Sequence, residues 1–177
     1  MRNAVRIAMA CVCGLIAAVP ISSAWAADHI TTYVPHAEKV GDGRLTVMFW
    51  DIYDASLYAP HGRWSTAQPF ALRLSYLRDI PGHKIADKSI EEIRKQGFDN
   101  EIRLADWHAQ LTRIFPDVDD QTSLTGIYTQ SGTTYFFSNS RAIGRITDPE
   151  FGHYFFDIWL GQKTTAPALR AQLLGRS

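Results

Sequence analysis

This sequence has few cysteines, glycines and prolines, and neither sign of charge is in excess. Its 177 residues include two cysteines, Cys11 and Cys13, both close to the N-terminus. Basic and acidic side chains number 18 each, so the chain lacks the basic excess of a nucleic-acid-binding protein. Twelve glycines and eight prolines are too few for a collagen-like or low-complexity chain. With 46% apolar and 20% charged residues, the composition is typical of one globular domain with a hydrophobic core.

The longest apolar run lies at the N-terminus and predicts a secretory signal peptide. Two arginines precede the segment Ile7–Ile21, which is shorter than the roughly 20 residues that a membrane-spanning helix needs. Ala24–Ala26 has the small-x-small pattern of a signal-peptidase site. We therefore expect residues 1–26 to be removed and residues 27–177 to form the domain. The mature protein is predicted to be periplasmic or secreted, with no stable membrane anchor.

Motifs for metal, cofactor and nucleophile chemistry are also missing. Both cysteines leave with the predicted signal peptide, so the mature chain has no disulfide, no thiolate nucleophile and no cysteine metal ligand. The six histidines include no HExxH or HxxxH pair, and the chain has no GxSxG motif, P-loop or GxGxxG in a βαβ frame. The sequence thus predicts no metal, no cofactor and no catalytic residue set.

Alternating apolar residues predict several strands. The segment Arg44–Tyr58 predicts one long strand, or two strands joined by a bulge, because the alternation slips by one residue near Asp51. The segment Phe70–Ile80 predicts a second strand. Later in the chain, a hairpin and a further short strand are expected at Ser123–Thr129, Thr133–Ser138 and Ala142–Ile146.

Helical spacing predicts helices both between and after these strands. Two helices are expected between the strands, at about Ala86–Gly97 and Asn100–Phe115. Asp148 followed by Pro149 predicts the start of a third helix with an aromatic face, and Pro167 that of a short last helix. This order of elements predicts an α+β fold, with a largely antiparallel sheet and helices packed on one face.

Polar side chains in the first two predicted strands are candidate ligand-binding residues. Asp51 and Tyr53 interrupt an apolar segment, and burying such groups is costly unless they form hydrogen bonds. Tyr76 and Arg78 stand at alternate positions and would share one face of their strand. If that face points inward, Arg78 could hold a carboxylate or enolate at the polar end of an apolar cleft. Alternatively, Arg78 forms a structural ion pair with Asp51 or Asp79.

Three segments resemble the bacterial chalcone isomerase-like family: Trp50–Tyr58, Tyr76–Ile80 and Ile90–Gly97. The resemblance extends over Gly41–Gly175. It implies the open-faced β-sandwich of that superfamily, an antiparallel sheet with helices on one face. Its members include plant enzymes that cyclise chalcones, plastid fatty-acid-binding relatives and exported bacterial proteins.

Few of the catalytic residues of the plant enzymes have counterparts in this sequence. Tyr53 stands where those enzymes have a threonine, and their helical Tyr and Asn correspond to Pro81 and Lys88. Arg44 corresponds to their substrate-binding arginine only in a shifted alignment. The fatty-acid-binding relatives need an Arg and a Tyr for the ligand carboxylate, and this chain has both residue types available.

Three functions are therefore compared. The first is non-catalytic binding of a small hydrophobic or fatty-acid-like ligand between sheet and helices, by Arg44, Asp51, Tyr53, Tyr76 and Arg78. The second is an isomerase (an intramolecular lyase) that stabilises an enolate or phenolate of a chalcone-like substrate. The third is a module that binds haem non-covalently through His108 or His153, or binds a protein through the aromatic third helix. The ligand and the oligomeric state stay open.

Overall fold

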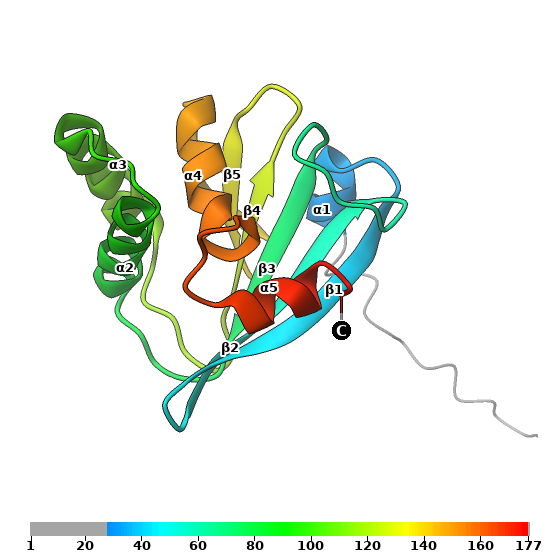
Figure 1. The fold of residues 1–177 in the computed structure, drawn as a ribbon, viewed down its shortest axis with the longest axis horizontal. Helices are drawn as coiled ribbons and strands as arrows, with labels where there is room; N and C mark the ends of the chain where they lie inside the picture. Colours follow the sequence, from blue (N-terminus) through cyan, green and yellow to red (C-terminus); the bar gives the residue numbers. More distant parts are fainter. Residues whose placement is uncertain (1–27, 177) are drawn as a thin grey trace, which may run out of the picture.

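A six-stranded antiparallel sheet, in the order β1-β2-β3-β4-β5-β6, forms the centre of the described part of the chain (Figure 1). The computed structural model describes residues 28–176, so the predicted signal peptide and its cleavage site lie outside the described residues. Every strand pairs with the next one in sequence. The strands are β1 (Ala37–Val47), β2 (Trp50–Pro60), β3 (Phe70–Tyr76), β4 (Ser123–Tyr128), β5 (Thr134–Ser138) and β6 (Arg141–Ile146).

Four helices cover one face of this sheet, and a short helix packs against the other face (Figure 1). The covering helices are α2 (Gly82–Lys95), α3 (Glu101–Ile114), α4 (Pro149–Leu160) and α5 (Pro167–Leu173), and the short one is α1 (Asp28–Tyr33). The predicted α+β class, an antiparallel sheet with helices on one face, is confirmed. The sequence analysis did not predict α1, whose Ile30 packs with Ala71, Ile127 and Phe137 behind the sheet.

The caps of α3 and α4 lie where the sequence predicts, whereas α2 begins at Gly82, before the expected start at about Ala86. Asn100 caps α3 by accepting a hydrogen bond from the Arg103 backbone N–H, and Asp148 caps α4 in the same way through Glu150. Gly97, with φ of 99°, reverses the chain just beyond α2, and this backbone conformation strongly favours glycine. These local signals fix the lengths of the helices that surround the site.

The predicted strand Arg44–Tyr58 is wrong: it is a hairpin of two antiparallel strands. The chain turns at Met48 and Phe49, and Val47 pairs with Trp50 across the turn. The slip in alternation near Asp51 thus comes chiefly from a reversal of direction, although β1 and β2 also shift register between Leu45 and Thr46. Two-residue hairpin turns usually contain Asn or Gly, so an apolar Met-Phe turn gave no recognisable signal.

The second predicted strand, Phe70–Ile80, is shorter than expected. β3 ends at Tyr76, and Ile80 forms an isolated bridge with Val118 before α2 begins. The alternation of faces expected for Tyr76 and Arg78 therefore ends within this segment.

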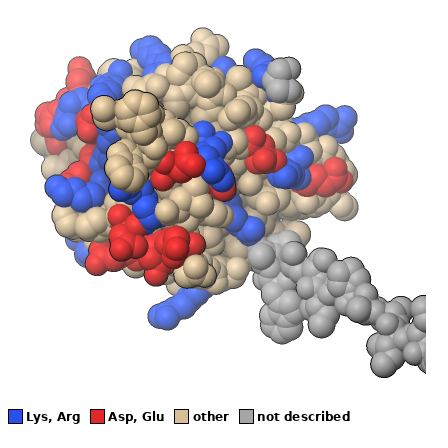
Figure 2. All heavy atoms as spheres, turned by 90° about the horizontal axis from the view of Figure 1, so that it is seen from below, with Lys and Arg blue, Asp and Glu red and all other residues tan. Residues whose placement is uncertain are grey.

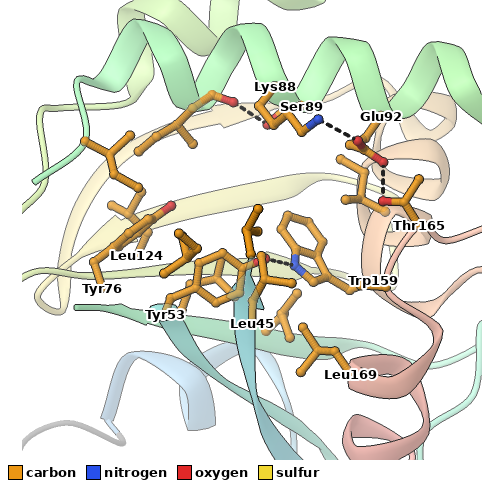
Figure 3. Close-up of a pocket in the computed structure, with 18 of the residues that line it drawn as sticks. Leu45, Tyr53, Tyr76, Lys88, Ser89, Glu92, Leu124, Trp159, Thr165 and Leu169 are labelled. Carbon is orange, nitrogen blue, oxygen red and sulfur yellow. Dashed lines mark hydrogen bonds and ion pairs between the residues drawn. The ribbon is translucent and has the colours of Figure 1, made fainter. Parts of the chain in front are cut away.

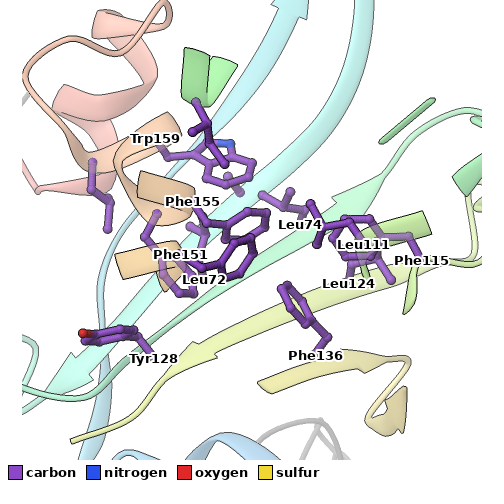
Figure 4. Packing of buried hydrophobic residues seen from close by; sticks show 14 of the residues in the cluster. Leu72, Leu74, Leu111, Phe115, Leu124, Tyr128, Phe136, Phe151, Phe155 and Trp159 are labelled. Carbon is purple, nitrogen blue, oxygen red and sulfur yellow. The ribbon is translucent and has the colours of Figure 1, made fainter. Parts of the chain in front are cut away.

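Aromatic side chains fill the space between α3, α4 and the last strands, and we call Phe98, Trp107, Phe136, Phe151 and Phe155 the aromatic core. Phe151 is fully buried, and its ring centroid lies 5.5 Å from that of Trp107 and 5.2 Å from that of Phe155. Figure 4 shows Phe151 and Phe155 of α4 above the strands, with Phe136 reaching up from β5. This packing anchors α3 and α4 to the sheet.

Candidate functional site

A cavity of about 930 Å³ lies between α2 and the sheet. Its volume is at the upper end of the range of small-molecule sites, roughly 300–1,000 Å³. α2 packs against α3 and α4, which hold it above the strands. Most of the lining is apolar and comes from the strands, α4 and α5, and it includes Leu72 and Leu74. Figure 3 shows Leu45, Leu124, Trp159 and Leu169 of this lining. Such a lining suits an apolar ligand.

Two tyrosines from neighbouring strands form part of the cavity wall. Tyr53 on β2 pairs with Tyr76 on β3, and their ring centroids lie 5.7 Å apart in an edge-on arrangement. The Tyr53 hydroxyl accepts a hydrogen bond of 2.8 Å from the indole N–H of Trp159 on α4. Burial raises the pKa of Tyr53 to about 12, so this phenol stays neutral at physiological pH.

The Tyr76 hydroxyl differs from that of Tyr53 because it has no hydrogen-bond partner among the described residues. The Tyr76 side chain is 3% exposed, lines the cavity, and points into it (Figure 3). Burial raises the pKa of Tyr76 as well, so its O–H keeps its proton. The hydroxyl oxygen is not among the fully buried polar atoms without a partner, so it is open to the cavity, where a polar ligand group would supply a hydrogen-bond partner.

On the opposite wall, α2 contributes a buried carboxylate, Glu92. It accepts a hydrogen bond of 2.7 Å from Thr165 and lies 2.9 Å from the ammonium group of Lys88 and 3.1 Å from that of Lys95. Burial alone would raise the pKa of Glu92, but the hydrogen bonds from Thr165, Lys88 and Lys95 outweigh burial and lower it. Glu92 is therefore ionised and already paired.

Arg44 and Asp51, two predicted site residues, belong to a surface network on the β1–β2 hairpin. The Arg44 guanidinium donates to Asp54 at 2.6 Å and to Asp51 at 2.8 Å, and all three side chains are about half exposed. Hydrogen bonds from Thr46 and then Arg44 lower the pKa of Asp51. Arg44 borders the cavity, but its charge is neutralised by these two carboxylates.

Arg78, the predicted carboxylate ligand, lies outside the cavity lining. Its guanidinium carbon is 4.9 Å from the centroid of the Trp50 ring, in a cation–π contact next to the hairpin turn. Within the described chain it forms no ion pair with Asp51 or Asp79, which was the alternative expectation. The structure thus brings Tyr53 and Tyr76 together and leaves Arg78 with Trp50.

Sequence analysis missed the polar residues that α2 places in the wall. Ser89 and Glu92 are both buried, line the cavity and follow the i, i+3 spacing of an inward helix face. Sequence analysis counted Glu92 with the charged residues that surround the apolar face of this helix and did not consider Ser89. Polar residues at this spacing on a helix were the available signal. Trp159 was placed correctly on the inner face of its helix, but its bond to Tyr53 spans 106 positions and no local pattern shows it.

The two histidines considered as haem ligands do not line the cavity. His108 Nε2 lies 2.8 Å from a carboxylate oxygen of Asp87, and His153 Nε2 lies 3.2 Å from the Tyr128 hydroxyl. Over residues 28–176, no cluster of three or more His, Cys, Asp or Glu side chains is placed to hold a metal ion.

The aromatic face of α4, considered as a protein interface, is buried against the sheet and α3. In the same range, no helix has the length and apolarity required to span a bilayer.

Comparisons with known proteins agree with this architecture. A family model described as chalcone isomerase-like matches residues 40–175. A protein from Haemophilus influenzae, itself described as uncharacterized, is 26% identical over 143 residues, which are 80% of this chain and 70% of that protein. The crystal structure of a fatty-acid binding protein from Arabidopsis thaliana superposes with a TM-score of 0.61 and 11% identity, over 79% of this chain and 87% of that one. This last likeness shows a shared fold.

Proposed function

Because the chain belongs to the chalcone isomerase-like family, we propose that it binds a fatty acid or a similar amphipathic molecule in the cavity under α2 without transforming it. One observation carries the proposal: a large, mostly apolar cavity whose wall holds a tyrosine hydroxyl, that of Tyr76, that forms no hydrogen bond within the described chain and is open to the cavity. An apolar tail and one polar head group match these two features. The fold shared with a plant fatty-acid binding protein supports the same ligand class.

The head group of such a ligand would accept a hydrogen bond from Tyr76. The lysines that line the cavity, Lys84, Lys88 and Lys95, stand on α2, across from the strand that carries Tyr76. Glu92 already engages Lys88 and Lys95, whereas the contact from Lys84 to Asp87 is long, at 3.5 Å, and exposed. A carboxylate bound to Tyr76 would therefore have Lys84 as the least neutralised cation along the lining.

The protonation states of the cavity favour binding over proton-transfer catalysis. A general acid or base works best with a pKa near the operating pH. Burial moves the pKa values of Tyr53 and Tyr76 upward, away from neutrality, and the hydrogen bonds of Glu92 move its pKa downward. The guanidinium expected to stabilise an enolate, that of Arg78, stacks on Trp50 instead. These groups suit a site that binds and releases a ligand without transforming it chemically.

The proposed location is the periplasm or the cell exterior. The basic start, the apolar segment 7–21 and the Ala24–Ala26 pattern support export and cleavage before Ala27. The intact mass of the exported protein tests this proposal, and a mass that still includes residues 1–26 would contradict it.

A matched pair of tyrosine substitutions tests the ligand site. Tyr76→Phe removes a hydroxyl without a protein partner, so the free energy of unfolding should stay within about 0.5 kcal/mol of the wild type. Affinity for a long-chain fatty acid should fall by about ten- to hundredfold, since a hydrogen bond to a charged group is worth about 1.5–3 kcal/mol. Affinity for the neutral methyl ester should fall less. Isothermal titration calorimetry measures both affinities.

Tyr53→Phe is the control because it deletes the same atom from the neighbouring ring. It leaves the Trp159 indole N–H without its acceptor and should destabilise the fold by about 1–3 kcal/mol. Its loss of fatty-acid affinity should be smaller than that of Tyr76→Phe. Equal affinities of wild type and Tyr76→Phe for the acid would contradict the assigned head-group site, and no saturable binding to the wild type would contradict the proposed function.

A further inference from the structure

The turn of the β1–β2 hairpin exposes four consecutive apolar side chains, which we call the hairpin tip: Val47, Met48, Phe49 and Trp50. Their exposed fractions are 50%, 84%, 92% and 63%. Within residues 28–176, the one other large apolar side chain with comparable exposure is Ile102, which stands alone on α3. A contiguous exposed apolar patch of this kind marks an interaction site far more often than scattered single residues do.

The local backbone favours other residues at this turn. Met48 has a positive φ of 57°, a conformation in which Gly, Asn and Asp are much more common. A polar turn would therefore form the hairpin at least as well and would avoid exposing apolar surface. The apolar side chains of the tip contribute nothing to the hydrophobic core, so their role lies outside folding.

We propose that the hairpin tip inserts into a lipid bilayer and docks the protein on the membrane surface. The hairpin projects beyond the rest of the sheet, so its turn can enter a bilayer while the body of the protein stays in water (Figure 1). Four side chains offer a few hundred Å² of apolar surface, less than the roughly 800 Å² per partner of a standard protein interface. Insertion into hydrocarbon needs no matching surface of that size.

The residues around the tip suit the boundary between head groups and hydrocarbon. Trp50 carries the Arg78 guanidinium on its ring, and such an amphipathic pair fits the head-group level, where Trp and Arg side chains are favourable. Met48 and Phe49, the most exposed of the four, would lie deepest, about 5–10 Å into the boundary region.

Basic and acidic side chains near the tip are present together, and their balance decides whether apolar insertion or electrostatic attraction dominates membrane binding. Arg44 is paired with two carboxylates, and the lysines of α2 stand among acidic neighbours. Figure 2, which views the molecule from the side toward which the hairpin projects in Figure 1, shows both signs of charge interspersed with uncharged surface. Apolar insertion should therefore dominate, with weak dependence on salt and on anionic lipid.

The tip is also continuous with the cavity. Val47 and Met48 line the cavity together with Lys84 and Lys88, so the membrane-facing turn forms part of the cavity wall. If the proposed function holds, an amphipathic ligand could pass between bilayer and cavity at this point. Docking itself does not depend on ligand binding, and the two are measured separately.

Flotation of the exported protein with phosphatidylcholine vesicles tests the docking proposal, once intact mass has shown that the chain begins at Ala27. The Phe49 side chain is 92% exposed and does not line the cavity, so Phe49→Ser should leave the free energy of unfolding and the fatty-acid affinity unchanged. Vesicle affinity should fall by about tenfold or more, since a Phe side chain is lost from hydrocarbon. Ile102→Ser, with a matched exposure of 85% on α3, should leave vesicle affinity at the wild-type value.

Three results would overturn the proposal. One is a wild-type protein that does not float with the vesicles, and another is equal flotation of wild type and Phe49→Ser. The third is a dimer in sedimentation that Phe49→Ser abolishes, because the tip would then serve self-association. The titration of soluble fatty acid is independent of these outcomes, so loss of docking and loss of the proposed ligand binding are distinguishable.

Discussion

The aromatic core and the cavity under α2 lie side by side over the same face of the sheet, yet one is filled and the other is hollow. Leu111 on α3 packs in the hydrophobic core, does not line the cavity and is fully buried. Leu74 on β3 is 8% exposed and lines the cavity. Both are apolar residues on the inner face of a regular element. Burial from solvent therefore does not distinguish a residue that supports the fold from one that borders a ligand site.

The difference arises from how the helices are supported. Rings from α3, α4 and β5 meet one another in the aromatic core, with centroids about 5–6 Å apart for Trp107, Phe151 and Phe155. α2, by contrast, is carried by α3 and α4, and its inner face presents the small or polar residues Ser89 and Glu92 to the strands. A helix held by its neighbours leaves space that its own side chains do not fill.

Matched leucine substitutions, one in the hydrophobic core and one in the cavity wall, should show the largest difference in unfolding free energy between the two regions. Leu111→Ala creates a new void in close-packed surroundings and should cost about 4–5 kcal/mol of unfolding free energy. Leu74→Ala enlarges a space that already exists, so it should cost about 2 kcal/mol, mainly the lost transfer free energy of the side chain. Denaturant unfolding of both variants measures this. Equal losses would mean that the cavity is packed as tightly as the core.

A smaller effect is expected from the charged wall of the cavity and its pH dependence. The pKa of Glu92 is lowered in the folded state, so its stabilising contribution is present above the ordinary value of 4.5 and is lost as the pH falls through the folded pKa. Glu92→Gln should therefore cost about 1 kcal/mol at pH 7 and progressively less below pH 4.5.

Glu91→Gln is the control for this experiment, because Glu91 shares both lysine partners with Glu92 but is half exposed. Unfolding free energies from pH 3 to pH 7 should change less for Glu91→Gln, as expected for a solvent-exposed pair. A Glu92→Gln variant with the wild-type pH profile would contradict the assignment of Glu92 as a buried, ion-paired wall residue.

The sequence predicted those features that depend on local chemistry or on periodicity. Helix caps at Asn100 and Asp148 and the inward faces of the helices follow from short-range signals, and the α+β class follows from the order of the elements. The hairpin turn at Met48 and Phe49 escaped prediction because its residues are apolar and carry no turn signal. The first half of β1 was missed because its residues on this edge strand do not alternate between apolar and polar.

The site was predictable only in part, for a similar reason. Tyr53 was named because a polar group in an apolar strand is unusual, and Tyr76 because it stands at an alternate position to Arg78; the structure places both tyrosines in one wall of the cavity. The partner of Tyr53, Trp159, depends on how α4 crosses β2, which no spacing along the chain reveals. Arg78 was assigned by extending the alternation of β3 beyond Tyr76, where the strand ends. The hollow itself has no sequence signature, since the same apolar patterns line filled and empty space.

The most direct test of the account is a fatty-acid titration of a variant whose cavity is filled. Leu74 and Leu124 pair across β3 and β4 and both line the cavity, so Leu74→Trp with Leu124→Trp places two large rings inside it. Because the space exists, this variant should stay folded, with a melting temperature within several degrees of the wild type. Calorimetric titration should give saturable one-to-one binding to the wild type and an affinity at least about tenfold lower for the filled variant. Equal affinities would contradict the claim that the ligand lies in the cavity under α2.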